Sequence, residues 1–209
     1  MVFVNPFTKI LPDVWEAAMI ERTDFDKAVT VYIDTRETKY AHITDALDLL
    51  GAKWERRKLD IGDSSFAVGD KDFSLSYIYE RKASVDELYS NLMERSGNQT
   101  NRLEKELRCA ARFVRATTLI VEGVPDMDAI ANYIVPDWAM KAVPNRIRRD
   151  IGKPVHAFLT DWHNKHRTSF QVLCVADKAD TARVMLDGFW RFYQSYRESI
   201  APRKARQKK

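Results

Sequence analysis

The chain has 209 residues, of which 45% are hydrophobic and 31% are charged, and its formal net charge is +4 at pH 7. This length and balance predict one sizeable hydrophobic core. No run of about 18 apolar residues occurs, which excludes a membrane-spanning helix, so we expect a protein of the cytoplasm, or of the nucleus in a eukaryotic host. Cys109 and Cys174 each lie inside an apolar pattern, which favours two buried thiols over a disulfide.

The first half of the chain alternates short strands with one helix. Residues 1–27 precede the first expected strand as an N-terminal extension. After them, β-branched runs indicate strands, and apolar residues at helical spacing indicate a helix. The expected elements are, in chain order, a strand over 29–33, a helix over 41–50, a strand over 54–61, and a hairpin whose arms span 66–68 and 73–79 around the turn 69–72.

The second half continues this alternation. Ser84 is followed three residues later by Glu87, a capping box that starts a helix running to about Glu94. Further on we expect a helix over 103–114, a strand over 117–121, a helix from 154 to about 165, a strand over 169–175 and a helix over 181–198. Together these elements predict a single α/β domain over 28–200, with a mixed central sheet flanked by helices. Prolines interrupt residues 124–154, which we interpret as an insertion with one short helix.

Basic residues gather in clusters along the chain, at 53–58, 146–149, 165–167 and 203–209. Such clusters suit the phosphates of a nucleic acid, although each cluster alone is also typical of a solvated face. The last cluster falls in the tail 201–209, which carries almost no apolar residues. We expect this basic tail to be disordered until it meets phosphate.

Acidic residues follow three of the expected strands. The segments are Ile33-Asp34-Thr35-Arg36-Glu37, Gly62-Asp63 and Glu80-Arg81-Lys82. Because side chains alternate along a strand, Glu80 and Lys82 should face one side and Arg81 the other. Hydrolysis of a phosphodiester uses a hard cation such as Mg²⁺, which carboxylate oxygens hold. The pattern therefore indicates a metal-dependent nuclease.

These segments, with Asp86 after the third, resemble the GDXnERKX3D signature of the XPF/Hef-type structure-specific endonucleases, a branch of the PD-(D/E)XK nuclease superfamily. The resemblance covers about 28–197. It implies a restriction-endonuclease-like fold and a DNA endonuclease that uses Mg²⁺ or Mn²⁺ and selects branched, flap or junction DNA.

The resemblance also implies a role for each matched residue. Asp34, Asp63 and Glu80 would ligate the metal, and Lys82 would contact the scissile phosphate or the attacking water. Glu37 would add an outer ligand or position water, and Arg36 and Arg81 would organise the acids or hold phosphate. Asp86 would fix the loop into the next helix, and Arg95 and Gln99 are candidates for phosphate binding.

Other interpretations stay open on the sequence alone. The chain has no room for the helix-hairpin-helix modules that relatives usually carry, so we expect a homodimer or a larger partner that supplies DNA recognition. A non-catalytic DNA-binding subunit and an RNA-directed nuclease are the alternative functions. A zinc site at His163, His166 and Cys174 is disfavoured, because structural zinc sites generally have four ligands.

Overall fold

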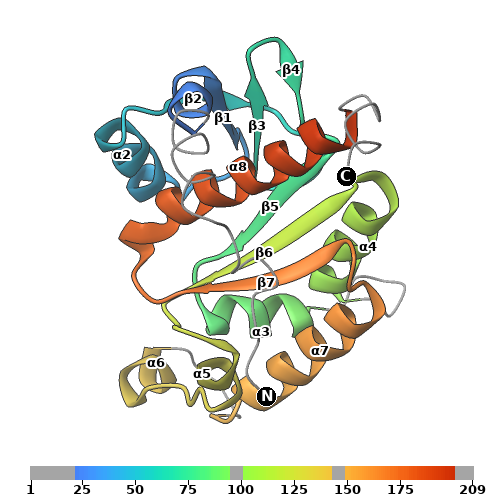
Figure 1. Cartoon of the computed structure of the whole chain (residues 1–209). Helices are drawn as coiled ribbons and strands as arrows, with labels where there is room; N and C mark the ends of the chain where they lie inside the picture. The colour runs from blue at the N-terminus through green and yellow to red at the C-terminus, as the bar shows by residue number, and fades with distance from the viewer. Residues whose placement is uncertain (1–21, 95–100, 143–148, 201–209) are drawn as a thin grey trace, which may run out of the picture.

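The structure is a computed structural model, and it describes residues 22–94, 101–142 and 149–200. A seven-stranded mixed sheet forms its centre, with strand order β2-β1-β3-β5-β6-β7 and β4 paired to β3 (Figure 1). The strands are β1 Val29–Asp34, β2 Lys53–Arg57, β3 Ser64–Val68, β4 Lys71–Asp72, β5 Tyr77–Lys82, β6 Ala116–Glu122 and β7 Phe170–Val175. The predicted α/β fold with a mixed sheet is confirmed.

The strand directions bring most carboxyl ends to one edge of the sheet. β1 pairs in parallel with β2, and β5, β6 and β7 pair in parallel with one another. β3 runs antiparallel to both β1 and β5, so β1 and β5 point the same way. The carboxyl ends of β1, β5 and β6 therefore meet at the same edge as the start of β3.

Helices cover both faces of the sheet. One face packs against α2 Ala41–Leu49 and α8 Thr181–Ile200, which follows the short 3₁₀ helix Lys178–Asp180. The other face packs against α3 Val85–Met93, α4 Arg102–Phe113 and α7 Gly152–Lys165. Each face therefore has its own hydrophobic core. No described helix is both long and apolar enough to cross a membrane.

An aromatic stack fills the core on the α8 side. Phe66 of β3 lies between Phe73 and Phe189, with ring centroids 4.7 Å and 4.5 Å away. Residues 22–28 are helical, and buried Phe25 joins this core against Trp190 at a centroid distance of 5.2 Å. The domain start predicted at residue 28 thus leaves out a core residue, while residues 1–21 lie outside the described ranges.

Gly188 lets α8 approach β5 closely. A Cβ at this position would overlap the hydroxyl of Tyr79, which is fully buried. We expect Gly188→Ala to lower the free energy of unfolding in a urea titration, because overpacking costs about 1–3 kcal/mol and outweighs the gain of about 1 kcal/mol from replacing glycine in a helix. Ser195→Ala, at an exposed position of the same helix, is the control. Equal stability of both variants would contradict this account of the contact.

Two sequence-based strand predictions are wrong in extent. The strand predicted over 54–61 ends at Arg57, because the backbone of Leu59 turns to donate a hydrogen bond to a carboxylate instead of pairing in the sheet. The second hairpin arm, predicted over 73–79, becomes a strand only at Tyr77 in β5, whereas β4 falls on Lys71–Asp72, inside the predicted turn 69–72. Asp72 accepts a hydrogen bond from the Ser74 amide, and the turn that follows lets Phe73 enter the core.

The helix start predicted at Ser84 is confirmed, although one bond of the capping box is shifted. The Ser84 hydroxyl accepts from the Glu87 amide at 3.2 Å, which satisfies an amide that the helix N-terminus leaves free. The Glu87 carboxylate accepts from the Ala83 amide at 2.9 Å, one residue before the cap, and not from the Ser84 amide. α3 therefore begins directly after β5.

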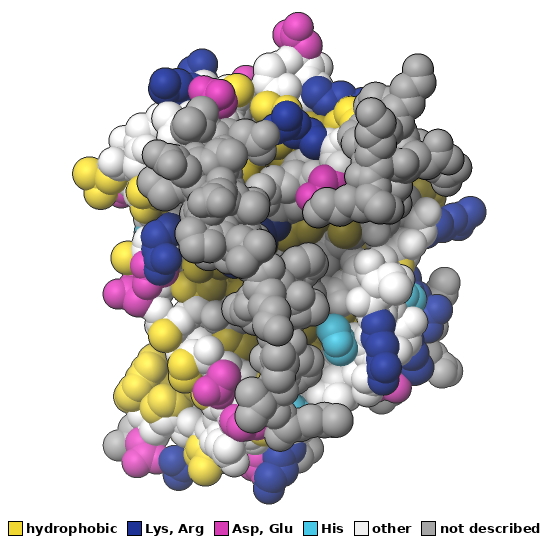
Figure 2. All heavy atoms as spheres, viewed as in Figure 1, with side chains coloured by type: hydrophobic (Ala, Val, Ile, Leu, Met, Phe, Trp, Pro, Cys, Tyr) yellow, Lys and Arg dark blue, Asp and Glu magenta, His cyan; other side chains and the backbone are white. Residues whose placement is uncertain are grey.

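The predicted insertion over 124–154 contains two short helices in its described part, α5 Met127–Ala131 and α6 Asp137–Ala142, where one was expected. Asp126 caps α5 through the Ala129 amide at 2.7 Å, a signal hidden among the prolines. Figure 2 shows hydrophobic side chains gathered over these helices, and Ile134 and Trp138 are 59% and 73% exposed. The insertion therefore presents apolar surface to solvent.

Candidate active site

The three acidic segments of the sequence meet at the edge of the sheet where β1 and β5 end. The Asp34 amide donates to the Asp63 carbonyl at 2.8 Å, and the Asp63 amide donates to the Tyr79 carbonyl at 2.9 Å. Residue 63 thus bridges β1 and β5 at the start of β3. A cleft of about 350 Å³ opens here, lined by Asp63, Glu80 and Lys82 among others.

Gly62 gives Asp63 this position. Its φ angle is +81°, a conformation that residues with a Cβ rarely adopt. A Cβ would also come within 2.9 Å of the Ile78 side chain. The Gly-Asp pair of the sequence motif is therefore a requirement of the backbone as well as of chemistry.

Asp63 and Glu80 form a pair of carboxylates in this cleft. Burial raises the pKa of Glu80 to about 8, and the nearby charge of Asp63 adds to this effect. Burial also raises the pKa of Asp63 to about 6, although its carboxylate accepts a hydrogen bond from the Arg81 amide at 2.8 Å. Two buried carboxylates resist being charged together. A bound cation would relieve this repulsion.

Lys82 lies beside the pair. Its side chain faces the same side as Glu80, as predicted from strand alternation, and its Nζ donates to Glu80 Oε1 at 3.0 Å. The same ammonium donates to Glu106 Oε2 of α4 at 2.9 Å. Burial alone would lower the pKa of Lys82, but Glu80 and Glu106 raise it above its ordinary value. Lys82, of which only 4% is exposed, therefore keeps its charge.

The Arg81 side chain points to the opposite side of β5 from Lys82 and belongs to a network of ion pairs and hydrogen bonds. Its Nη1 donates to Glu122 Oε2 at the end of β6, at 2.7 Å, and its Nη2 lies 3.2 Å from Glu37 Oε1. Glu122 also accepts from the Thr181 hydroxyl at 2.7 Å, and its Oε1 lies 2.8 Å from Nε2 of His42. This buried network joins β5 and β6 to α2 and α8, which indicates a structural role for Arg81.

The sequence as a whole matches the family that its motifs suggested. The ERCC4 domain matches residues 33–186. The chain belongs to the ERCC4 domain family. Every segment of the cleft described above lies inside the matched region, so the resemblance to the XPF/Hef-type nucleases is confirmed.

Solved structures show the same fold as this ERCC4 domain. XPF from Aeropyrum pernix superposes with a TM-score of 0.54 at 21% identity, covering 79% of this chain and 65% of that chain. XPF from Aeropyrum pernix in complex with DNA gives a TM-score of 0.50 at 20% identity, covering 84% of this chain and 68% of that chain. The chain thus spans less than two thirds of the first structure's own length. No curated protein matches the chain.

The ERCC4 domain places Asp34 differently from the other acids. Its carboxylate is 1% exposed and accepts hydrogen bonds from the amide and the guanidinium of Arg36, and from the amide of Leu59 at 2.6 Å. Burial would raise the pKa of Asp34, but these bonds hold it below its usual value. Asp34 thus orients Arg36, which lines the cleft, and does not line the cleft itself.

Two of the remaining predicted residues, Glu37 and Asp86, lie in the described part of the chain. Glu37 lines the cleft, where its carboxylate accepts from the Lys39 amide at 2.8 Å. Asp86 lies in the first turn of α3 and accepts a hydrogen bond from the Tyr133 hydroxyl of the insertion. The candidates Arg95 and Gln99, and the basic tail 201–209, lie outside the described residues.

Sequence reasoning missed three charged residues of this region, namely Arg102, Glu106 and Glu122. Glu106 lies next to Leu107 on the buried side of α4, where a charged residue indicates a buried partner. Glu122 ends an apolar strand in the same way as Asp34 does. Once the buried faces of α4 and β6 are assigned, the sequence itself shows Glu106 and Glu122 as charged residues among apolar ones.

The structure describes the residues of the disfavoured zinc site, His163, His166 and Cys174, and also Cys109. His163 Nδ1 lies 3.1 Å from the Phe170 carbonyl oxygen, and the ring of His166 stacks on Trp162. Among the described residues, no group of three or more His, Cys, Asp or Glu side chains is arranged to hold a metal ion. Cys174 is partly buried, whereas Cys109 is exposed beside the cleft, so the expectation of two buried thiols is wrong for Cys109.

Proposed function

We propose that this ERCC4 domain is a metal-dependent endonuclease that hydrolyses DNA phosphodiester bonds and selects branched, flap or junction DNA. The observation that carries the proposal is the Asp63–Glu80 carboxylate pair with the charged Lys82 beside it, in a cleft open to solvent. A partner subunit without catalytic function would have no need of this buried and repulsive arrangement.

The carboxylate pair fits a divalent cation such as Mg²⁺ or Mn²⁺. Asp63 and Glu80 supply hard oxygen donors, and burial raises the pKa of both carboxylates, which favours a further positive charge beside them. Two protein carboxylates suffice, because Mg²⁺ keeps several waters and accepts phosphate oxygens. When bound, the ion would neutralise charge on the phosphate and activate water. The ligand role implied for Asp34 stays a prediction, since it would require breaking the bonds to Arg36.

The charged side chains of the cleft would act on the scissile phosphate. The Lys82 ammonium would neutralise a phosphate oxygen as negative charge develops there, because a compact buried charge stabilises such a state without reorganisation. Arg36 and Arg102 line the same cleft and offer planar donors to the phosphodiester. Glu37, whose carboxylate accepts from the Lys39 amide, would orient water.

Partner and substrate shape are part of the proposal. The XPF chain in the first comparison is longer than the part matched here. We propose that a second copy or a larger partner supplies the additional DNA contacts that a branched substrate needs. The second solved structure is of XPF in complex with DNA, and this likeness supports DNA as the ligand class of this chain.

The test is cleavage of end-labelled substrates by the purified protein. The panel contains single-stranded, duplex, flap, splayed-arm and four-way DNA and a matched RNA, each with Mg²⁺, Mn²⁺ or EDTA. We expect cutting of a branched DNA with either metal and none in EDTA. Cutting of RNA alone would support the RNA-directed alternative, and binding without cutting would support a non-catalytic subunit.

A further inference from the structure

Glu106 contacts the catalytic lysine although it lies outside every sequence motif. It belongs to α4, and its Oε2 accepts a hydrogen bond from Lys82 Nζ at 2.9 Å. The same ammonium donates to Glu80 Oε1 at 3.0 Å. Lys82 is therefore shared equally between a carboxylate that we assign to the metal and one that has no assigned role.

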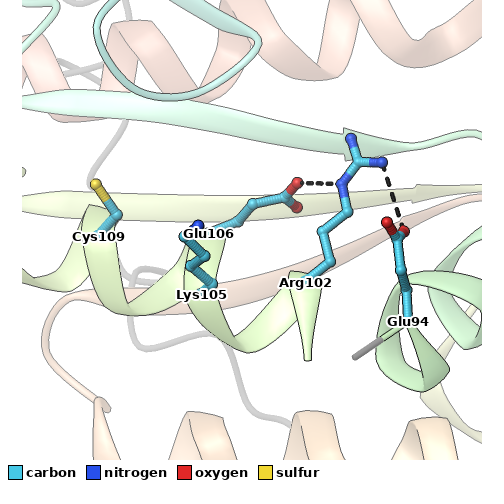
Figure 3. A pocket seen from close by; sticks show the side chains of 5 residues that line it. All are labelled: Glu94, Arg102, Lys105, Glu106 and Cys109. Carbon is cyan, nitrogen blue, oxygen red and sulfur yellow. Dashed lines mark hydrogen bonds and ion pairs between the residues drawn. The ribbon is translucent and has the colours of Figure 1, made fainter. Parts of the chain in front are cut away.

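Glu106 is itself held in a fixed position. Its Oε1 accepts from Arg102 Nε at 2.9 Å, and Arg102 also reaches Glu94 at the end of α3, with an Nη1 to Oε2 distance of 3.7 Å (Figure 3). Burial would raise the pKa of Glu106, but Lys82 and Arg102 hold it below its ordinary value. Glu106 thus lies on the wall of the cleft between two cationic side chains, with its own side chain 26% exposed.

Lys82 and a divalent cation would share Glu80. The ammonium, 3.0 Å from Glu80 Oε1, already holds one of the two carboxylate oxygens, so a cation that binds through this oxygen displaces the ammonium. A buried ammonium that loses its only counter-ion is strongly destabilised. Because Glu106 offers a second counter-ion on the other side, Lys82 can release Glu80 without being left unpaired.

We propose that Glu106 is a positioning residue, which holds the Lys82 ammonium in place by its hydrogen bond while Glu80 turns its oxygens to the divalent cation. The proposal rests on the proposed function, since it uses the same cation. Without the Glu106 charge, Lys82 would pair with Glu80 alone, and the ion would bind less tightly.

The test measures Mn²⁺ binding to the protein without DNA, by calorimetry. Glu106→Gln keeps the shape and removes the charge. We expect it to weaken Mn²⁺ binding by about fivefold or more, since coupling between residues in contact is commonly about 0.5–3 kcal/mol. In the Lys82→Met background there is no competing ammonium, so the same substitution should have a clearly smaller effect.

Controls separate positioning from other roles. Glu104→Gln, on the same helix and paired with Arg108 at 2.9 Å, should leave Mn²⁺ binding unchanged. Glu106→Asp keeps the charge and should restore most of the affinity, and circular dichroism verifies that every variant is folded. Equal weakening by Glu106→Gln with and without Lys82 would overturn the proposal, because it would mean that Glu106 ligates the ion or acts only through its charge. If the unsubstituted protein binds no Mn²⁺, both the positioning role and the proposed function fail.

Discussion

Lys82→Met is expected to lower the rate constant of DNA cleavage by about 10²- to 10³-fold, the loss typical of removing one group that stabilises charge in a transition state. Lys82 is buried against Glu80 and Glu106 in the cleft and contributes little surface to the bound duplex, so DNA affinity should change little. Single-turnover cleavage of the best substrate, together with fluorescence anisotropy for binding, measures both quantities.

Lys27→Met is the matched control for this prediction. Lys27 is exposed and lies just before β1, at the edge of the sheet opposite the cleft and outside the basic clusters. This variant should cleave at the unsubstituted rate. Unchanged turnover in Lys82→Met would contradict the role of the lysine, and a parallel loss in both variants would point to general charge effects.

Glu122→Ala is expected to lower the free energy of unfolding by about 3–5 kcal/mol, the cost of leaving a buried charge without its partner. Glu122 is 3% exposed, and its carboxylate accepts from Arg81 and Thr181. Its removal leaves the Arg81 guanidinium with Glu37 as its remaining carboxylate. Urea denaturation followed by circular dichroism gives the free energy.

Asp161→Ala provides the comparison, since it removes one partner of the exposed ion pair between Asp161 and Lys165, which lie 2.6 Å apart. Such pairs contribute about 0–1 kcal/mol, because water screens both charges. A loss in Glu122→Ala no larger than the loss in Asp161→Ala would show that the network around Arg81 does not stabilise the fold.

Much of the site follows from local rules in the sequence. Alternation along β5 predicts that Glu80 and Lys82 share a side. Ser84 and Glu87 likewise predict where α3 begins. These features depend on neighbours within a few residues, and the structure confirms them.

Other features depend on distant residues, which local patterns cannot reveal. The resemblance implies that Asp34 ligates a metal, yet in the structure its carboxylate accepts a hydrogen bond from the amide of Leu59, 25 residues later. Glu106 reaches Lys82 across 24 positions of the chain because α4 packs beside β5. The late start of β5 has a similar origin, since the Phe73 ring stacks on Phe66 of β3 and the chain turns directly after Phe73.

The central claim is that the Asp63–Glu80 pair makes this ERCC4 domain a metal-dependent DNA nuclease. Its most direct test is cleavage of labelled flap DNA in Mg²⁺ by the unsubstituted protein and by Glu80→Gln, with DNA binding measured for both. The account predicts cutting by the unsubstituted protein that EDTA abolishes, no cutting by Glu80→Gln, and equal binding. Cutting that persists in Glu80→Gln, or binding by both proteins without any cutting, would contradict it.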